Sequence, residues 1–596
     1  MLLAAIYLFS ALLFGIFLAN RFFKKNLLFY GAVLGIFFSA WLSFGLAFLC
    51  GVSELNLVLS SGVLLVFTLY LSKLSPVSRR SLSDFNALLV LLCFSFFVLL
   101  NFTQTFIISP RTGNIALFFS DTDFHLSLVS SFSLGNNFPP VYPFLSAVHL
   151  TYYFLFDFFS GLLVVGGFNL LFAFCAYNVI IQTAFVFLLY SFCRKVLGSR
   201  IWAWLALFLV FFVGSLYAFE ALLRFSEFST PLEAFFGSAF WFKEGYAFCP
   251  NLQTIVDSRA FLMGFAVSLI VYEWFFEKRN PNIFLAALIG LLPLFHASFI
   301  PLSIAVVAFG FLSLTKTNLP VWLKFFAVLS CLALPQLAYL ASNKEFVFSL
   351  WFGWTNTSPD IFSGAVNLLK NFGGFFFLFF VGLACIPKEK RLLLACFALP
   401  AGIGMLTKLS PWAFDNIKFF LFWALLSCIF GVLWLKKTWQ GAKLIGKSLL
   451  VLLVLLLVSS GLLGQYSYFF LRYPFGTILK NELPVCAFIE QNLPKDAIIL
   501  TSGERTCAYV LYGRKVFFGE DRILFTHGVD FSEAVLENAR MLQGDCDLLK
   551  KYQIQYYYAG GYSPYPELAK VEPKVRDIST LIFENKGNKL YRINCE

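Results

Sequence analysis

Residues 2–25 read LLAAIYLFSALLFGIFLANRFFKK, an apolar run that ends in a basic cluster. The apolar part, residues 2–20, is long enough for a helix to cross the ~30 Å hydrocarbon core of a bilayer. Arg21, Lys24 and Lys25 follow the run instead of preceding it, so the basic start of a secretory signal peptide is missing. We therefore interpret the stretch as a retained membrane helix whose basic end lies in the cytoplasm.

The composition of the whole chain agrees with this interpretation. Of its 596 residues, 59% are hydrophobic and 13% are charged, whereas a soluble globular chain carries about 25% charged residues. The mean hydropathy is +0.80, so lipid must be the solvent for most of the chain. The formal net charge is +12, but the basic residues are scattered between apolar runs, which indicates membrane topology and argues against nucleic-acid binding.

Apolar runs of similar length recur through most of the chain. They predict an α-helical polytopic membrane protein with about fourteen transmembrane helices in residues 1–464. The predicted spans lie near residues 2–20, 27–50, 54–74, 86–108, 169–193, 201–223, 259–277, 282–296, 298–315, 321–341, 371–387, 391–407, 417–435 and 446–465. A further apolar stretch, 142–166, is ambiguous, because Tyr152 and Asp157 suit a lipid-exposed span poorly.

Basic clusters between the runs orient the predicted helices, because Lys and Arg are retained on the cytoplasmic side. The clusters lie at residues 21–25, 73–80, 194–200, 278–279, 316, 388–391 and 436–437. The external segments are then 109–141, 224–258, 342–370, 408–416 and the tail. Since Arg194 is inside, 142–193 must cross an odd number of times, and a single crossing makes 142–166 re-entrant or interfacial. We expect a multi-pass protein of the plasma membrane with both termini outside.

Residues 465–596 change character and predict a small soluble α/β domain on the extracytoplasmic side. LPVCAFIEQNLP predicts a short amphipathic helix stopped by Pro494, and SEAVLENARML predicts a second helix with Ser532 as a candidate N-cap. DAIILTS and IQYYYAGG predict strands, and TLIFENKGNKLYRI predicts a hairpin that turns at residues 586–588.

The tail also holds four of the thirteen cysteines of the chain: Cys486, Cys507, Cys546 and Cys595. In an exported domain, four cysteines permit two disulfides in any of three pairings, and we expect at least one bridge. Most of the other cysteines lie in the apolar runs, where they are small residues compatible with lipid.

The first large external segment, 109–141, carries Asp121, Asp123 and His125 within SDTDFH. A carboxylate in this place lies in water close to low-dielectric lipid, which strengthens its interaction with a proton or a cation. It could accept a proton from an attacking hydroxyl or hold a divalent metal against a phosphate, with His125 as a further substrate contact. An isolated D-x-D pair is also common in solvated loops, so the spacing alone leaves both interpretations open.

The run SDTDFH, followed by NNFPPVYPF and YYFLFDFFSGLL, resembles the first lumenal loop of the GT-C superfamily of glycosyltransferases. Members of this superfamily are multispanning enzymes that use lipid-phosphate-linked sugars, and the resemblance implies a catalytic Asp in this loop. Further stretches resemble a poorly characterised prokaryotic branch: DSRAFLMGF, GLLPLFHASF, FGWTNTSP, PWAFDNIK and GRKVFFGEDRILFTHGVDFSEA. In simpler members the loop follows the first helix, whereas additional predicted spans precede it here.

Polar residues at the external ends of later predicted helices are candidate substrate contacts. Arg259 could hold a lipid phosphate bidentately, or simply extend to the membrane surface. His296 could contact substrate or be a satisfied structural histidine. Asp415 and Lys418, three residues apart, could pair with each other or face the substrate, with Lys418 as a phosphate contact. Trp354 resembles a platform for a sugar face, although external Trp residues also form the interfacial belt.

Together these patterns favour a glycosyltransferase that moves a sugar from a polyprenyl-phosphate-linked donor to an extracytoplasmic glycan, lipid or protein acceptor. Asp121 or Asp123 would be the base, with Asp123 slightly preferred because it adjoins the aromatic and His of DFH. Arg259, with Lys418 second, would hold the departing phosphate. Membrane lipids would surround the spans. The patterns require no cofactor, although a divalent metal is compatible with the carboxylates.

A transporter or flippase of a lipid-linked or polar substrate is the main alternative. It predicts charged residues paired inside the spans and helices broken at the midplane, whereas most ionisable groups here cluster at helix ends and in loops. A non-catalytic membrane scaffold is a third alternative. No Walker motif, zinc spacing or nucleophile elbow is visible, which argues against an ATP-driven transporter. The tail, in which no catalytic constellation is visible, would be an acceptor-side or scaffolding module.

Overall fold

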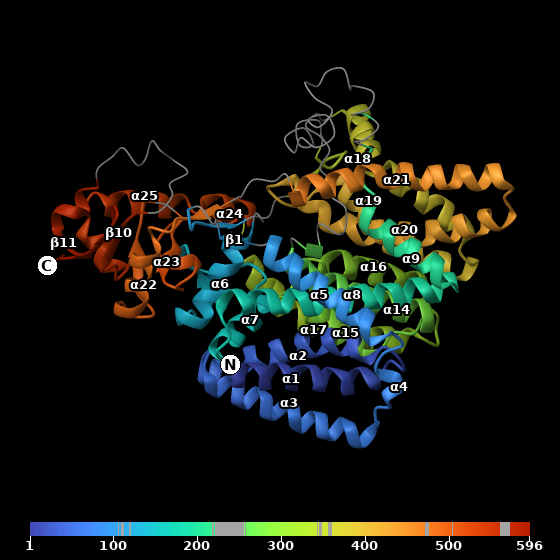
Figure 1. The fold of residues 1–596 in the computed structure, drawn as a ribbon, viewed down its shortest axis with the longest axis horizontal. Coiled ribbons are helices and arrows are strands. Elements are labelled where there is room, and N and C mark those ends of the chain that lie inside the picture. The colour runs from blue at the N-terminus through green and yellow to red at the C-terminus, as the bar shows by residue number, and fades with distance from the viewer. Residues whose placement is uncertain are drawn as a thin grey trace. The chain divides into compact units, whose positions relative to one another are not determined.

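The computed structural model is mostly helical (Figure 1) and divides into two compact units. It describes residues 1–104, 106–108, 112–117, 121–216, 220, 255–256, 258–342, 344, 348–355, 360–470, 476–502, 505–560 and 573–595. Parts of the predicted external segment 109–141 and most of 224–258 lie outside these residues. The first unit comprises Met1–Thr183, Tyr339–Glu345 and Pro474–Glu596, and the second comprises Ala184–Ala338 and Phe346–Tyr473.

Apolar helices form the N-terminal part of the first unit. They are α1 (Leu2–Asn20), α2 (Leu27–Cys50), α3 (Glu54–Leu74), the short α4 (Arg79–Leu82), α5 (Ala87–Gln104) and the beginning of α8 (Leu170–Leu197). Helices α1 and α2 approach closely through glycines, since a Cβ added to Gly15 would lie 2.0 Å from the carbonyl oxygen of Gly31. Small residues at such interfaces allow the close packing that holds helices together in lipid.

The second unit is also built from apolar helices. After the end of α8 it contains α9 (Arg200–Phe212), α14 (Arg259–Lys278), α15 (Ile283–Gly290), α16 (Phe299–Leu312), α17 (Leu319–Ala341), α18 (Ile361–Cys385), α19 (Lys388–Leu406), α20 (Ile417–Gly441) and α21 (Leu444–Phe470). The last residues of α17 belong to the first unit. A two-stranded pair, β5 (Ser349–Leu350) with β6 (Thr407–Lys408), and a 3₁₀ turn, η2 (Ala413–Asn416), complete it.

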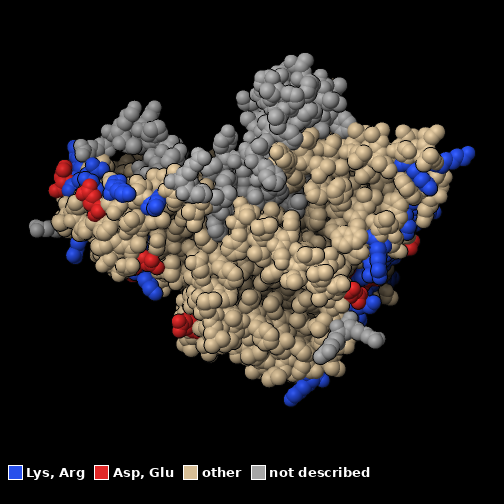
Figure 2. Space-filling view, in the orientation of Figure 1, with Lys and Arg blue, Asp and Glu red and all other residues tan. Residues whose placement is uncertain are grey.

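A helix lies in each of the predicted spans, but two of these helices are much shorter than predicted. Helix α15 has 8 residues within the predicted span 282–296, and α9 ends at Phe212 within the predicted span 201–223, part of which lies outside the described residues. Among the helices that the structure describes, nine are long and apolar enough to cross a membrane, and α5, α9 and α16 are shorter apolar helices. Figure 2 shows a largely uncharged helical surface, with Lys, Arg, Asp and Glu side chains gathered at helix ends and over the tail. The chain is therefore an integral membrane protein, and the number of its crossings stays a prediction.

The ambiguous stretch 142–166 contains no helix of crossing length. Strands β3 (Val141–Tyr142) and β4 (Leu145–His149) form an antiparallel hairpin. The following helix, α7 (Leu155–Val165), has 11 residues, whereas a crossing requires about 20. Helix α7 packs against α6 (Thr122–Leu134), with its Asp157 fully buried. A crossing by α7 alone is therefore not expected, and the re-entrant or interfacial placement of 142–166 stays a prediction.

The tail contains the predicted strands and helices. Its helices are α22 (Leu483–Asn492), α23 (Cys507–Val510), α24 (Asp521–Thr526), α25 (Ser532–Leu542), α26 (Cys546–Lys551) and the 3₁₀ helix η4 (Lys574–Ile578). Its strands are β8 (Ile498–Leu500), β9 (Lys515–Val516), β10 (Tyr556–Ala559), β11 (Ser579–Asn585) and β12 (Asn588–Ile593). They form a mixed sheet in the order β11-β12-β10-β8-β9, in which β8 is parallel to both of its neighbours.

One predicted detail of the tail is wrong. Helix α25 begins at Ser532, but Phe531 and not Ser532 occupies the N-cap position. The side chain of Asp530 accepts the backbone N–H of Ser532 at 2.9 Å. The carboxylate of Asp530 thus accepts one of the free N–H groups at the start of α25. The hydroxyl of Ser532 is not needed as a cap for that group.

The tail folds directly against the predicted external segment. Strands β1 (Phe106–Ile108), β2 (Ile115–Leu117) and β7 (Gly476–Ile478) form an antiparallel sheet in which β2 lies in the centre. Ile115 is opposite Ile478, so the start of the tail pairs with the strand of the external segment. The outer strand β1 lies at the end of the predicted span 86–108, where the structure has a strand in place of the expected helix end. The predicted division into domains at residues 464 and 465 stays a prediction.

A second contact joins α6 to α23, which lie side by side in Figure 1. The hydroxyl of Ser130 donates to the carbonyl oxygens of Tyr509 and Val510 at 3.0 and 3.1 Å. A Cβ added to Gly135 would lie 1.8 Å from the carbonyl oxygen of Gly513, so only glycine permits this approach. The external segment and the tail are therefore parts of one folded body.

Candidate functional site

The two predicted carboxylates lie at the start of α6 in different environments. Asp121 occupies the N-cap position, where its carbonyl oxygen accepts the N–H of His125 at 3.0 Å, and the residue is exposed. Asp123 lies in the first turn and is 3% exposed. Acidic residues suit this end of a helix because the unsatisfied N–H groups there carry partial positive charge. One carboxylate thus faces water and the other faces the protein interior.

Asp123 belongs to a buried cluster of three charged side chains. Its Oδ2 lies 2.7 Å from Nε of Arg505, and the same Nε donates to Oε1 of Glu520 at 2.8 Å. The remaining oxygen of Asp123 accepts the backbone N–H of Phe124 at 2.9 Å. Arg505 and Glu520 are 5% and 8% exposed. We call Asp123, Arg505 and Glu520 the acid–arginine cluster.

The charges in the acid–arginine cluster do not balance. Burial raises the pKa of Asp123, while the Arg505 guanidinium opposes this rise and the nearby Asp121 adds to it. Burial also raises the pKa of Glu520, and the negative charge of Asp123 adds to that rise. Two carboxylates competing for one guanidinium away from water therefore favour a bound proton.

Sequence reasoning did not find Arg505 or Glu520. No motif surrounds either residue, and both are hundreds of positions from Asp123. Glu520 does lie in the run GRKVFFGEDRILFTHGVDFSEA that carries part of the family resemblance, which was the only signal available. The tail thus supplies two of the three buried charges of the cluster, while its expected role as an acceptor-side or scaffolding module stays a prediction.

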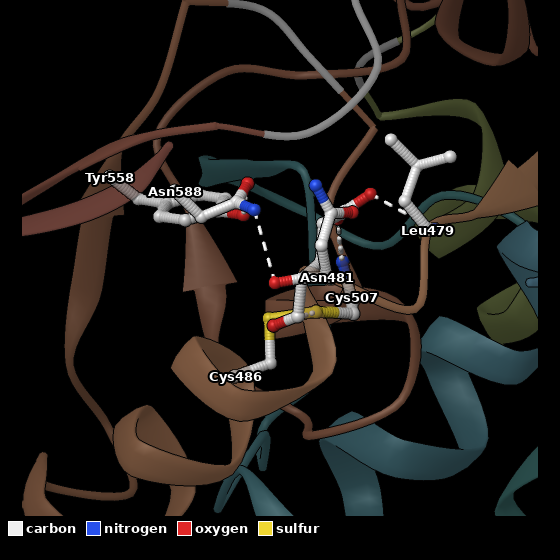
Figure 3. Close-up of a disulfide and its surroundings, with 7 residues drawn as sticks. Leu479, Asn481, Cys486, Cys507, Tyr558 and Asn588 are labelled. Carbon is white, nitrogen blue, oxygen red and sulfur yellow. Dashed lines mark hydrogen bonds between the residues drawn. A yellow bond between two sulfur atoms is a disulfide. The ribbon is translucent and has the colours of Figure 1, made fainter. Parts of the chain in front are cut away.

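A disulfide holds the segment that carries Arg505 (Figure 3). Cys486 in α22 is bonded to Cys507 at the start of α23, two residues beyond Arg505. The buried carboxylate of Glu482 accepts the backbone N–H groups of Leu479 and Cys507 at 3.1 and 3.4 Å, which adds a second tie between the same segments.

The other tail cysteines form a second disulfide, Cys546–Cys595. The expectation of at least one bridge is confirmed, and this structure selects one of the three pairings.

A buried His–Asp pair joins α6 to α7. His125 Nδ1 lies 2.7 Å from Oδ2 of Asp157, and the two side chains are 6% and 0% exposed. Phe124 and Phe156 lie against the ring of His125, with centroid distances of 5.1 Å in both cases. A carboxylate bonded to one ring nitrogen fixes the orientation of an imidazole. The orientation of the His125 ring, two residues after Asp123 on α6, is therefore fixed.

Aromatic rings from α6, from the stretch 142–166 and from the tail meet around His527. The ring of His527, which lies in the tail, stacks on Tyr152 with a centroid distance of 3.9 Å and an interplanar angle of 17°. Phe124 contacts the edge of His527 at 4.9 Å, and the hydroxyl of Tyr142 lies 3.4 Å from its Nδ1. His527 is a third tail residue that the sequence analysis did not single out.

Arg259 and His296 lie close to the start of α14 in the second unit. Arg259 is the first residue of the helix and is 1% exposed. His296 is also 1% exposed, its Nδ1 accepts the N–H of Ser298 at 3.0 Å, and its ring meets Phe261 at 4.8 Å. A Cβ on Gly264 would lie 3.0 Å from the same nitrogen, so α14 approaches the His296 turn closely. This placement favours the structural interpretation of His296, and its role as a substrate contact stays a prediction.

The predicted pairing of Asp415 with Lys418 is present in the second unit. Lys418 Nζ lies 3.0 Å from Oδ1 of Asp415, and Oδ2 accepts the hydroxyl of Ser410 at 2.7 Å. Lys418 also lines a cavity of about 20 Å³ together with Phe261 and Ser298. That volume is close to the space of a single water molecule.

Trp354 is packed inside the second unit. It is 1% exposed, and its ring lies 5.1–5.8 Å from the rings of Phe372, Phe414 and Phe420. A sugar platform presents an open ring face, whereas the faces of Trp354 are surrounded by aromatic side chains. Its role as a sugar contact stays a prediction that this placement does not favour.

The predicted site residues thus fall into two sets. The first unit contains Asp121, Asp123 and His125, and the second contains Arg259, His296, Trp354, Asp415 and Lys418. That the two sets converge on one cavity stays a prediction. Within the described ranges, no group of three His, Cys, Asp or Glu side chains is placed to hold a metal ion. A metal requirement likewise stays open.

Comparison with known proteins gave one type of match. No family model matches the chain, and no curated protein matches it. Among solved structures, the chain is similar to the archaeal oligosaccharyltransferase AglB from Archaeoglobus fulgidus, solved with an inhibitory peptide and a dolichol-phosphate. The identity is 12% and the TM-score 0.38, over 80% of this chain and 70% of that chain. At this TM-score the likeness carries no conclusion about mechanism.

Proposed function

We propose that this protein is a membrane glycosyltransferase that moves a sugar from a polyprenyl-phosphate carrier to an acceptor on the outer face. The observation that carries the proposal is the contrast at the start of α6, where Asp121 is exposed and Asp123 is buried in the acid–arginine cluster. Two carboxylates buried around one cation are costly to stability, and such groups gather at functional sites. An exposed carboxylate beside them suits acid–base chemistry at the membrane surface.

We assign the contact with the acceptor to Asp121. Its side chain is open to water, whereas both oxygens of Asp123 are already engaged. The acceptor hydroxyl oxygen attacks the anomeric carbon of the donor while the bond from that carbon to the carrier phosphate breaks. Asp121 takes the hydroxyl proton, and the phosphate leaves with the bonding electrons. The slight preference for Asp123 drawn from the sequence is therefore exchanged for Asp121.

The departing phosphate needs fixed positive charge, and Arg259 is the first candidate to supply it. As the first residue of α14, its guanidinium adds to the positive end of the helix. Lys418 is the second candidate, and its ammonium is held near the start of α20 by Asp415. His125 and His296 are retained as candidate substrate contacts, and Trp354 as a candidate sugar contact although its burial does not favour that role. The acceptor is a glycan, a lipid or a protein.

The proposed reaction takes place outside the cytoplasm. The disulfides Cys486–Cys507 and Cys546–Cys595 support this placement, because disulfides persist in oxidising compartments. Since the tail and α6 are parts of one folded body, an external tail places Asp121 outside as well. We propose the plasma membrane as the location.

A direct test supplies purified protein in liposomes with polyprenyl-phosphate-linked hexoses that carry a tritiated sugar. Water or a membrane extract provides the acceptor hydroxyl, and loss of label from the lipid phase is measured. The Asp121→Asn variant keeps the shape of the side chain but cannot take a proton, so we expect a rate about 10²–10⁴-fold lower. Asp123→Asn should lower the rate less, and Asp547→Asn, at an exposed position of the tail, should leave it unchanged.

Two outcomes would count against the proposal. Wild-type protein that releases no label from any donor would remove its basis. Full activity in the Asp121→Asn/Asp123→Asn double variant would show that another group carries the chemistry. Equal expression and equal melting temperatures are required of all variants, so that loss of folding is not mistaken for loss of catalysis.

The transporter alternative is less well supported by the described spans. In the first unit, the buried polar contact between α5 and α8 is a neutral amide ladder in which Asn101 donates to Gln182 at 2.7 Å and accepts from Asn178 at 3.1 Å. In the second unit, the pair of Lys195 with buried Glu273 lies near helix ends that carry basic clusters. A transporter pathway places ionisable groups at the midplane.

A further inference from the structure

One nitrogen serves two carboxylates in the acid–arginine cluster. Asp123 Oδ2 and Glu520 Oε1 lie 2.7 and 2.8 Å from the same Arg505 Nε, which carries a single hydrogen. That hydrogen is donated to Glu520 Oε1, so Asp123 Oδ2 lies at ion-pair distance from the nitrogen without receiving it. A proton on either carboxyl group would supply the missing donor between them.

The groups around the cluster do not neutralise its excess charge. Asp121, at the start of α6, adds a negative charge near Asp123. Tyr509, from α23, is fully buried and interacts with all three members of the cluster. Arg522, from α24, lies 3.8 Å from Glu520 Oε2, but its side chain is 64% exposed and so is well screened by water.

We propose that Asp123 and Glu520 share one proton across Arg505, and that the tail thereby completes and tunes the charge of the site on α6. The proton comes from water, one carboxylate becomes a carboxylic acid, and the cluster becomes neutral. Glu520 and Arg505 are then positioning residues that act through Asp123 on Asp121. As an account of catalysis, this inference rests on the proposed function.

The geometry makes the sharing dependent on tail docking. Arg505 and Glu520 reach Asp123 only because α6 packs on α23 and because the Cys486–Cys507 disulfide ties the Arg505 segment to α22. Displacement of the tail would leave Asp123 as a lone carboxyl group at the start of α6. The charge beside Asp121 therefore depends on whether the tail is in place.

Infrared spectroscopy of the purified full-length protein in nanodiscs tests the shared proton without any substrate. In wild type, the carbonyl stretch of a protonated carboxyl group should persist to a pH at which the exposed carboxyl groups have ionised. Glu520→Gln and Asp123→Asn each leave one carboxylate with one guanidinium, so each single variant should lose this band. Glu584→Gln, at an exposed position on β11, should retain it.

The pattern across the variants decides the outcome. Loss of the band in both Glu520→Gln and Asp123→Asn supports sharing, whereas survival in either one places the proton on a single residue and overturns the inference. Absence of the band in wild type also overturns it. If the band behaves as expected but no lipid-linked hexose is consumed, the proposed function fails and the shared proton stands. If sugar transfer occurs but the band is absent, the proposed function stands and the shared proton is refuted.

Discussion

At the scale of the residue, the protein places like charges where burial should exclude them. Asp123 and Glu520 are both buried, and their pKa values are raised above those of ordinary carboxyl groups, chiefly because burial disfavours the charged form. Arg505 compensates one of the two charges. A carboxyl group with a raised pKa in the folded state binds its proton more tightly there than in the unfolded chain, so the cluster links stability to pH.

The sign of this linkage gives a testable prediction. The stability that Asp123 and Glu520 contribute is fully present below the ordinary carboxyl pKa and is lost as the pH rises through their raised values. Glu520→Gln should therefore reduce the fall in melting temperature between acidic and neutral pH. Groups such as Asp530, whose pKa is lowered by the N–H of Ser532, act in the opposite direction but are common to both proteins. A variant whose profile parallels that of wild type would contradict the prediction.

At the scale of the element, short segments of the tail are held by covalent and polar ties. The Cys486–Cys507 disulfide closes a loop with a sequence separation of 21, and Asn588 donates to the carbonyl oxygen of Asn481 beside it at 3.1 Å (Figure 3). Helix α23 has only four residues, which is too short to be stable by itself. The disulfide and α6 together therefore position the segment that carries Arg505.

Removing each disulfide separates its stabilising role from its role at the site. For a loop of this length, the Cys486→Ala/Cys507→Ala variant should lose about 3 kcal/mol of unfolding free energy. It should also lose sugar transfer, because Arg505 is released from Asp123. The matched control is Cys546→Ala/Cys595→Ala, which removes a disulfide that closes a longer loop with a separation of 49. This variant should lose comparable stability with less effect on sugar transfer. Equal losses of transfer in the two variants, measured where both are folded, would argue against a specific role for the first bridge.

At the scale of the whole molecule, the distribution of basic clusters predicts the orientation of the chain in the membrane. The predicted cytoplasmic clusters place the turn after α16 inside and the tail outside. Thr317 and Glu584 are both exposed and represent these two sides. An orientation opposite to this one would place the disulfides of the tail in a reducing compartment.

Cysteine labelling of intact cells tests this orientation. Glu584→Cys should react with a membrane-impermeant maleimide, and Thr317→Cys should react only after the membrane is permeabilised. The unsubstituted protein provides the background from its own thiols. Protection of Glu584→Cys in intact cells, with reaction after permeabilisation, would place the tail and the start of α6 inside and would refute the proposed external reaction.

The sequence alone could predict those features that depend on local pattern. The length of the apolar runs predicted where the membrane helices lie, and the clusters of Lys and Arg predicted their orientation. Alternating or helical periodicity predicted the strands and helices of the tail. Asp121 and Asp123 could also be found from the sequence, because both residues lie within one short motif. These inferences need no knowledge of which segments meet.

Only the tertiary structure decided which distant residues meet. Arg505 and Glu520 reach Asp123 because α6 packs against the tail, and no motif near them announces that contact. The cysteine pairing was open among three alternatives until the packing of α22 on α23 selected Cys486 with Cys507. The sequence suggested Trp354 as an exposed platform for a sugar, but the residue is buried among aromatic rings. A local pattern encodes how a segment is solvated, whereas its partners depend on the shapes of surfaces assembled from the whole chain.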